Sequence, residues 1–433
     1  MVNVLAEPKK SRQLIFANLV GTLLEIYDMS IYAYFAPMIA ANFFPSSSTS
    51  VALMNTLAIF MVSFIVRPVG GIIFGHIGDT LGRKKTLVLT ISLISLGTFG
   101  IGVLPNAQHI GLLAPVLLIF FRIVQGLSFS GEFVGSLIFL MEQAPPNKRG
   151  YMSSWAVSGG NIGLLLASLL CCAISHFCDK QQIMAWGWRI PFILGLFGGL
   201  VSLHFRYQII EIFPYPKASR YRFPLAEVLR TQKKSLLIIL SLTCFYMVVS
   251  YLLYVCSATY LSQLADISMS RALAINSIAL LLQSIMIPVI GALSDKIGRK
   301  FLLRIGIVGL IASVYPYYLT LENGNLFWVC MAHVSISFIA TFFTSILPTT
   351  LAELFPSRTR YSGVGLGYNM AAMMVGGITP VMAIYILKIP HGTMLLSLYF
   401  IFWALLALIG TIKIERHQNS DLPDDIIAIT TSI

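Results

Sequence analysis

Charged residues are scarce in this sequence. Asp, Glu, Lys and Arg make up 11% of the 433 residues, whereas a soluble domain carries about 25% charge. Apolar residues make up 57% of the chain, and the mean hydropathy is +0.83. This composition excludes an ordinary soluble domain and indicates a membrane protein.

Residues that support metal or redox chemistry are also sparse. The 6 cysteines have no paired CxxC spacing, and the 7 histidines have no metal-ligand spacing. We therefore predict neither an enzyme nor a metal site. A cleavable signal peptide is missing too, because the first apolar run is too long and carries acids. We expect that run to remain as the first membrane helix.

Long apolar runs recur along the chain. A run of about 20 residues can cross a bilayer core of about 30 Å, and we predict twelve such spans. They are Leu14 to Ile39, Val51 to Phe74, Thr86 to Leu104, Leu112 to Leu140, Met152 to Ser175, Ile190 to Tyr207, Ser235 to Leu261, Ala272 to Leu293, Phe301 to Thr320, Leu326 to Pro348, Ser362 to Leu387 and Thr393 to Ile412.

The net charge of +12 invites a nucleic-acid interpretation, but the position of the basic residues excludes it. They gather in every second loop, beginning before the first span and ending in the tail, with several in the middle loop, Arg206 among them. Because basic loops stay in the cytoplasm, both termini are predicted to be cytoplasmic. The charge records topology and predicts a lipid bilayer, not a nucleic acid, as the partner.

A motif occurs twice, about half a chain length apart. Gly75-His-Ile-Gly-Asp79-Thr-Leu-Gly82-Arg83-Lys84 follows the second span, and Gly291-Ala-Leu-Ser-Asp295-Lys-Ile-Gly298-Arg299-Lys300 follows the eighth. Two parallel six-helix repeats predict a transporter with its site at the repeat interface. We expect bundles at 1–207 and 235–413, a cytoplasmic linker loop at 208–234 and a cytoplasmic tail at 414–433.

The motif G-x-x-x-D-x-x-G-R-K resembles the loop signature of the major facilitator superfamily. Its carboxylate can pair with the arginine one turn later and with a neighbouring helix N-terminus, so we expect a gate between alternating-access states. The alternative is that these charges only cap and orient helices. The predicted gating residues are Gly75, Asp79, Gly82, Arg83, Lys84, Asp295, Arg299, Lys300, Glu353 and Arg358.

Further stretches resemble the metabolite:proton symporter family, which includes carriers for proline and betaine, 2-oxoglutarate, citrate and shikimate. They include Gly21-Thr-Leu-Leu-Glu25-Ile-Tyr27-Asp28, Arg67-Pro68-Val-Gly70-Gly71, Arg122-Ile-Val-Gln125-Gly126 through Glu132, and Trp186-Gly187-Trp188-Arg189-Ile190-Pro191. Thr22 and Ile26 depart from the family pattern and put inherited specificity in question. The resemblance implies an importer that moves a small organic solute together with a proton.

Five ionisable residues lie inside the predicted spans, all in the first half. Such residues are costly in a bilayer and are functional by default. Glu25 and Asp28 share one helix face, and Arg122, Gln125, Phe129 and Glu132 form a polar stripe that we expect to face a cavity. We predict Asp28 and Glu132 as the proton-coupling acids, with Glu25 as an alternate.

Arg122 has two competing roles. Its guanidinium can anchor a substrate carboxylate bidentately, or it can form an ion pair with Glu25 or Asp28 that only pins helices one and four together. Arg67, the fifth residue, is predicted to be a helix-end or latch residue.

Polar and aromatic residues of both halves can complete a substrate site, although most single tyrosines serve packing. The predicted substrate-binding residues are Arg122, Gln125, Tyr27, Tyr32, Asn161, Tyr254, Gln283, Tyr368 and Asn369. Aromatic and amide groups suit a zwitterion or quaternary amine. His333 is interpreted as a core histidine.

The sequence thus predicts an all-α membrane protein with twelve transmembrane helices in two pseudo-repeats. We expect a monomeric, proton-coupled importer of a carboxylate or zwitterion such as proline, betaine or a dicarboxylate. It would lie in the inner membrane and need no cofactor beyond the coupling proton. The alternative is an exporter of a drug or metabolite, but Ser158-Gly159-Gly160-Asn161-Ile162-Gly163 lacks the Gly-Pro pair typical of exporters.

Overall fold

The computed structural model describes residues 8–45, 48–208, 224–265, 267–322, 325–387 and 389–414. The first-half elements are α1 Pro8–Tyr34, α2 Ala36–Phe43, α3 Thr49–Ile65, α4 Arg67–Thr80, α5 Arg83–Val103, α6 Ala107–Ile110, α7 Leu113–Glu142, the 3₁₀ turn Pro146–Lys148, α8 Arg149–Phe177, α9 Lys180–Ala185, the 3₁₀ turn Gly187–Arg189 and α10 Ile190–Gln208.

The second-half elements begin with a short helix in the predicted linker. They are α11 Pro224–Thr231, α12 Lys233–Ser250, the π-helix η4 Tyr251–Val255, α13 Ser257–Leu264, α14 Met269–Ile297, α15 Arg299–Glu322, α16 Leu326–Thr344, α17 Leu347–Glu353, α18 Arg360–Ala371, the π-helix η5 Ala372–Gly376, α19 Thr379–Ile386 and α20 Gly392–Ile412.

Eleven helical segments of the described chain are long and apolar enough to cross a membrane. They correspond to eleven of the twelve predicted spans, and the second span runs through both α3 and α4. The remaining span, predicted at Ser362 to Leu387, is divided into α18, η5 and α19. The break lies just before Pro380, which lacks the N–H needed to continue a helix.

The linker prediction needs one correction. Part of the stretch expected to be a loop at 208–234 is the helix α11, whose Glu227 accepts a 2.9 Å hydrogen bond from Arg358. Residues 209–223 and the tail from 415 onward lie outside the described residues. The domain boundaries themselves remain predictions.

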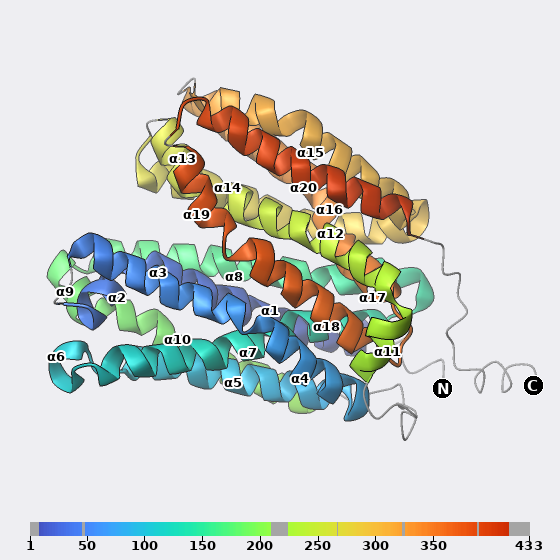
Figure 1. Cartoon of the computed structure of the whole chain (residues 1–433), viewed down its shortest axis with the longest axis horizontal. Helices are drawn as coiled ribbons and strands as arrows, with labels where there is room; N and C mark the ends of the chain where they lie inside the picture. Colours follow the sequence, from blue (N-terminus) through green and yellow to red (C-terminus); the bar gives the residue numbers. More distant parts are fainter. Residues whose placement is uncertain are drawn as a thin grey trace, which may run out of the picture.

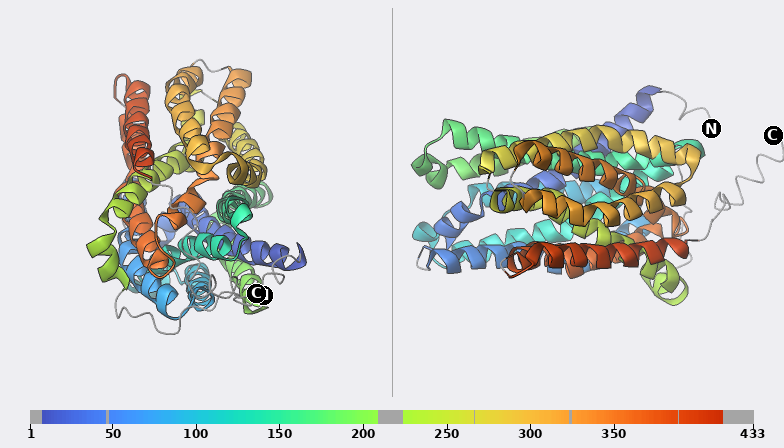
Figure 2. Two further views of the ribbon diagram at one scale, coloured as in Figure 1. Left: turned by 90° about the vertical axis from the view of Figure 1, so that its right-hand side faces the viewer. Right: turned by 90° about the horizontal axis from the view of Figure 1, so that it is seen from above.

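The long helices run roughly parallel to the longest axis of the molecule (Figures 1 and 2). In Figure 1 the first-half helices form the lower part, and α13, α15, α16 and α20 lie in the upper part. Where the halves meet, α8 lies against α14 and α4 lies against α18. Helices of one repeat therefore pack against helices of the other repeat, as expected if the two repeats share an interface.

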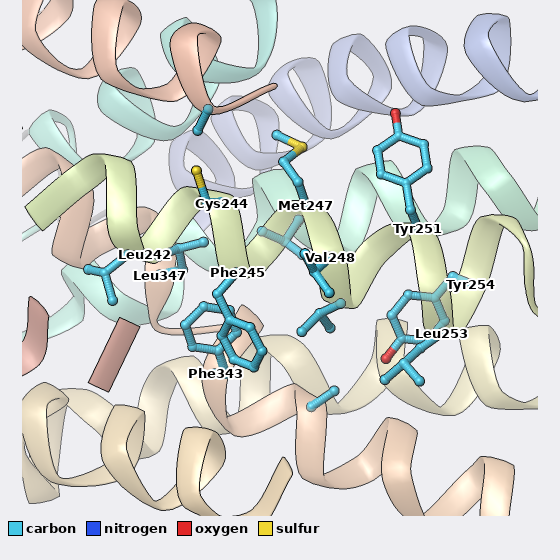
Figure 3. Close-up of a cluster of buried hydrophobic side chains, with 14 of the residues drawn as sticks. Leu242, Cys244, Phe245, Met247, Val248, Tyr251, Leu253, Tyr254, Phe343 and Leu347 are labelled. Carbon is cyan, nitrogen blue, oxygen red and sulfur yellow. The ribbon is translucent and has the colours of Figure 1, made fainter. Parts of the chain in front are cut away.

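The helix α12 shows how a span divides its two faces. Phe245 points into the second half, where its ring centroid lies 4.9 Å from that of Phe343. Met247 and Tyr251 project from the other side of the helix (Figure 3). Tyr251 contacts the first half, its ring centroid 6.1 Å from that of Phe64 on α3. One face of this span thus builds the core, and the other builds the interface between the halves.

The first copy of the repeated motif joins the two halves at the end of the bundle that carries the basic loops. Asp79 accepts a 2.6 Å hydrogen bond from Arg83 one turn later. Its two oxygens also accept the backbone N–H groups of Tyr361, at 3.1 Å, and Ser362, at 2.8 Å. A helix N-terminus has unpaired N–H groups and a positive partial charge, so this carboxylate ties α4 to the start of α18.

The second copy makes the equivalent connection with the roles of the two halves exchanged. Asp295 accepts the backbone N–H groups of Gly150, at 2.8 Å, and Tyr151, at 3.0 Å, in the first turn of α8. Arg299 pairs with Asp295 at 3.3 Å and also with Glu353. We call these two connections the Asp79 latch and the Asp295 latch. Both are closed, so the basic end of the interface is shut.

The two latches differ in depth. Around Asp79, a network of Arg83, Glu142 and Arg360 lies inside the protein, with Arg360 donating to Glu142 at 2.7 Å and Arg83 to the Ser357 carbonyl at 2.9 Å. The Asp295 latch instead borders a cavity of about 670 Å³ at the basic end, lined in part by Lys300. Water can therefore reach the second latch more readily than the first.

Glycines of the motif are required by geometry at two kinds of position. Gly82 and Gly298 have φ values of 102° and 107°, which L side chains rarely adopt. Gly75 and Gly291 instead allow close approach: an added Cβ would lie 2.9 Å from the Ser362 Cα and 2.7 Å from the Gly150 carbonyl oxygen, respectively.

The remaining predicted gating residues lie at helix ends nearby. Lys84 donates to the Tyr207 carbonyl at 2.9 Å, and Lys300 donates to the Ile414 carbonyl at 3.0 Å. Both lysines therefore donate hydrogen bonds to backbone carbonyls near the ends of α10 and α20. Arg358 forms an ion pair with Glu227 of α11.

Gly75→Ala should open the basic end, because overpacking against Ser362 costs about 1–3 kcal/mol only while the end is closed. Spin labels at the exposed positions Leu81 and Phe301, in a background whose native cysteines are replaced, should report a longer distance by pulsed electron resonance. Gly160→Ala is the control, since its Cβ meets only Ile26 within the first half, at 3.2 Å. An unchanged distance distribution in Gly75→Ala would contradict this account of the latch.

Candidate functional site

An ion pair inside the first half joins four helices. Asp28 on α1 accepts hydrogen bonds from Thr98 on α5, at 2.5 Å, and Gln125 on α7, at 2.8 Å. The Arg122 guanidinium on α7 lies 3.8 Å from the Asp28 carboxylate. It also donates to Gln125 and to Ser63 on α3, each at 2.9 Å. We call this group the Asp28–Arg122 centre.

Aromatic rings cover the guanidinium of this centre. The Arg122 Cζ lies 4.3 Å from the Tyr32 ring centroid and 5.2 Å from that of Phe60. Asp28 and Arg122 are 1% and 0% exposed. Of the two roles that the sequence allowed for Arg122, this conformation contains the ion pair with Asp28.

Glu132 forms a second buried pair with a partner that sequence reasoning missed. It accepts hydrogen bonds from Arg206, at 2.9 Å, and Thr90, at 2.7 Å. Arg206 was assigned to the basic middle loop, but it is a buried residue in the last turn of α10. Gly21 on α1 makes room for this pair, because a Cβ there would collide with Arg206 and Glu132.

The polar stripe on α7 is buried in this conformation, and its position beside a cavity stays a prediction. Gln125 and Glu132 both reach α5, and Glu132 also reaches α10. These two side chains find their partners within the first half. The physical reason is that a charge enclosed by helices must be paired or hydrogen-bonded.

Two tyrosines predicted to contact substrate also turn away from the interface. Tyr27 donates to the Pro191 carbonyl at 2.8 Å, and Tyr32 donates to the Thr56 carbonyl at 3.2 Å. Both hydroxyls are used inside the first half. Their positions near Asp28 in the sequence could not reveal this. The tyrosines lie on the same helix as Asp28, but their hydroxyls do not face the second half.

Other predicted residues do meet at the interface. Asn161 on α8 donates to Gln283 on α14 at 2.6 Å, and Gln283 donates to the Tyr254 hydroxyl at 2.6 Å. Asn369 on α18 donates to the Ser130 carbonyl at 2.9 Å. The Asn161–Gln283 and Asn369–Ser130 bonds cross between the halves, so they must break or rearrange when the halves move apart.

Aromatic rings from both halves stack at the same interface. The Phe133 ring centroid lies 5.0 Å from that of Tyr368 and 6.3 Å from that of Tyr246. His333, by contrast, lies within the second half, 3.0 Å from the Tyr317 hydroxyl. That contact fits its interpretation as a core histidine.

Arg67 is a helix-end residue, as one of its two predicted roles had it, since it is the first residue of α4. It is only 3% exposed and takes no part in either latch. One guanidinium nitrogen lies 2.9 Å from the Met29 sulfur, and the Cζ lies over the rings of Phe64, at 4.7 Å, and Phe129, at 5.4 Å. The sequence did contain an indication that Arg67 is buried, since this arginine precedes a proline inside an apolar run.

Comparison with known proteins agrees with this architecture. The Major Facilitator Superfamily model matches residues 19–380. The glycine betaine/proline/ectoine/pipecolic acid transporter of Dickeya dadantii is 30% identical over 425 residues, covering 95% of this chain and 84% of that protein. The proline/betaine transporter of Escherichia coli is 30% identical over 432 residues, covering 95% and 85%. The predicted resemblance to the metabolite:proton symporter family is confirmed.

Solved structures share the fold. The proton:xylose symporter XylE bound to 6-bromo-6-deoxy-D-glucose superposes with a TM-score of 0.75 at 16% identity, covering 93% of this chain and 95% of that one. A partially occluded inward-open form of XylE gives a TM-score of 0.66 at 17% identity, covering 93% and 97%. The chain therefore belongs to the Major Facilitator Superfamily of multi-pass membrane transporters and is not an enzyme.

Proposed function

We propose that this chain imports a small zwitterionic solute of the proline or betaine type together with a proton, across the cytoplasmic membrane of a bacterium. The names of the relatives support the solute class. The basic loops, which favour a cytoplasmic location for both termini, support the orientation. The observation that carries the coupling is the Asp28–Arg122 centre.

Protonation of Asp28 would change the forces within this centre. The ionised carboxylate holds Arg122 by charge, in addition to the hydrogen bonds from Thr98 and Gln125. A neutral carboxylic acid leaves Arg122 with its hydrogen bonds to Gln125 and Ser63 and with the rings that cover it, but without an anion. Removing one partner of a buried ion pair costs about 3–5 kcal/mol, which is enough to shift an equilibrium between two arrangements of α1 and α7.

The energy available from the proton suits such a carrier. Moving one charge through 100 mV supplies about 2.3 kcal/mol. At about 1.36 kcal/mol per tenfold ratio, one coupled proton supports roughly fifty-fold accumulation of a neutral solute. The closed latches require that the halves rock apart at the basic end before a solute is released there.

Asp28→Asn should abolish uphill uptake but preserve exchange. The amide keeps the size of the carboxylic acid and can still accept from Thr98 and Gln125, but it cannot release a proton. Proteoliposomes with an imposed pH gradient should accumulate labelled proline with the wild type and only equilibrate it with the variant, while counterflow persists. Asp179→Asn is the matched control, because Asp179 is an exposed cap of α9. Gradient-driven accumulation by Asp28→Asn would refute the assignment.

Glu132→Gln should lower the stability of the protein and leave proton-coupled uptake intact. It leaves Arg206 buried without its anion, and we expect a loss of about 3–5 kcal/mol, measured as a lower melting temperature in detergent. The paired change Glu132→Leu with Arg206→Met should recover much of that loss, because it removes both charges. Protein that survives as Glu132→Gln should still concentrate solute against its gradient. Intact stability combined with lost uphill uptake would instead return Glu132 to the proton pathway.

A further inference from the structure

Two buried side chains of opposite type, one basic and one acidic, form no close ion pair in the described part of the bundle. Arg67 is 3% exposed and Glu25 is 2% exposed. Within the described part of the chain, no ion pair shorter than 4.0 Å is formed by either side chain. The Arg67 Nε and the Glu25 Oε2 lack a hydrogen-bond partner there, but so do the Nε atoms of Arg122 and Arg206, and it is the missing ion pair that sets Arg67 apart. Such groups are costly, so their presence calls for a partner that enters from outside the chain.

The other buried arginines of the first half make the contrast clear. Arg83, Arg122 and Arg206 each lie within 4.0 Å of a carboxylate. The fold can therefore supply a matching acid where a charge is structural. Arg67 receives only a sulfur atom and two aromatic faces.

Both unpaired charges lie where the halves meet. Phe64, which stacks under Arg67, contacts Tyr251 and lies against Gly376 and Gly377 of the second half. Figure 3 shows the Tyr251 ring projecting from the helix on the side away from the Phe245 core. Arg67 therefore lies at the interface that alternating access would open.

Glu25 approaches the same interface from α1. Its carboxyl lies near the backbone of Phe133, whose ring stacks with those of Tyr246 and Tyr368. Arg67 lies over the ring of Phe64, which contacts Tyr251. Tyrosines of the second half therefore lie beside residues that contact Glu25 and Arg67.

We infer that Arg67 and Glu25 are the two poles of the substrate site. The Arg67 guanidinium binds the substrate carboxylate in a fork. Glu25, with the faces of Tyr246 and Tyr368, binds the substrate ammonium by charge and cation-π contact. This inference rests on the proposed transport function and moves the carboxylate anchor from Arg122 to Arg67.

The arrangement selects by charge. A short zwitterion neutralises both poles at once, because its carboxylate and ammonium are separated by one or two carbons. A dicarboxylate would place its second negative group beside Glu25, which is repulsive. The site therefore favours proline and betaine solutes over citrate or 2-oxoglutarate.

The test uses glycine betaine and its isostere 3,3-dimethylbutyrate, in which carbon replaces the ammonium nitrogen, so that the carboxylate stays and the positive charge is lost. Binding to the purified full-length protein is measured by equilibrium dialysis with labelled ligands. Glu25→Gln should weaken glycine betaine binding by about tenfold to hundredfold and leave 3,3-dimethylbutyrate binding unchanged. Arg67→Gln should weaken both ligands, and Arg67→Lys should weaken them less. Arg230→Gln, at an exposed position on α11, is the control.

Stability provides a second readout that does not need a ligand. Removing an unpaired buried charge should leave the melting temperature of ligand-free Arg67→Gln or Glu25→Gln unchanged or higher. Arg122→Gln, which breaks a formed pair, should lower it. A destabilised Arg67→Gln would assign Arg67 a structural role and overturn the inference.

The binding outcomes separate the two proposals. If the wild type binds neither glycine betaine nor proline, the zwitterion assignment and this site both fail. If the wild type binds and transports them, but Arg67→Gln binds as tightly or Glu25→Gln weakens both ligands equally, only the two-pole site is wrong.

Discussion

A charge in a helical bundle within hydrocarbon must find a partner, and this requirement organises the molecule. Asp28 with Arg122, and Glu132 with Arg206, bind α1, α3, α5, α7 and α10 into a unit whose polar groups face one another. Because each pair draws on several helices, the first half can move as one body. The second half has no comparable internal ion pair among its described membrane residues and is held by aromatic and aliphatic packing, such as Phe245 on Phe343.

Between the halves, the same chemistry is used in a reversible form. The two latches join a carboxylate to backbone N–H groups of a helix start, so each contact combines a full charge with a partial one. Such contacts are weaker than a fully buried pair, and water can replace them when the halves separate. The glycines at 75 and 291 bring the backbones close enough for these contacts to form. The motif therefore occurs twice because each repeat supplies one of the two contacts that close the interface.

Hydropathy and charge distribution were sufficient to predict the spans, the repeat and the place of the latches, because these properties depend on residue type and spacing alone. Partner identity was not predictable in the same way. Arg206 has the sequence context of a topological loop residue, and only the rotation and depth of α10 bring it to Glu132. The division of the eleventh span was also missed, since Pro380 near a span end is compatible with a continuous helix until the preceding π-helix is known.

The arrangement of the buried charges also determines how the membrane potential can drive transport. If Arg67 and Glu25 receive a zwitterion, their charges are matched by those of the solute, and the occupied site has no net charge to move through the membrane field. The membrane potential can then act only through the proton carried by Asp28, whose counter-charge Arg122 stays with the protein. A carrier built in this way separates solute recognition, which is electrically neutral, from the energy input, which is not. That separation explains why one half holds both an acid in an ion pair and an acid without one, only three residues apart on α1.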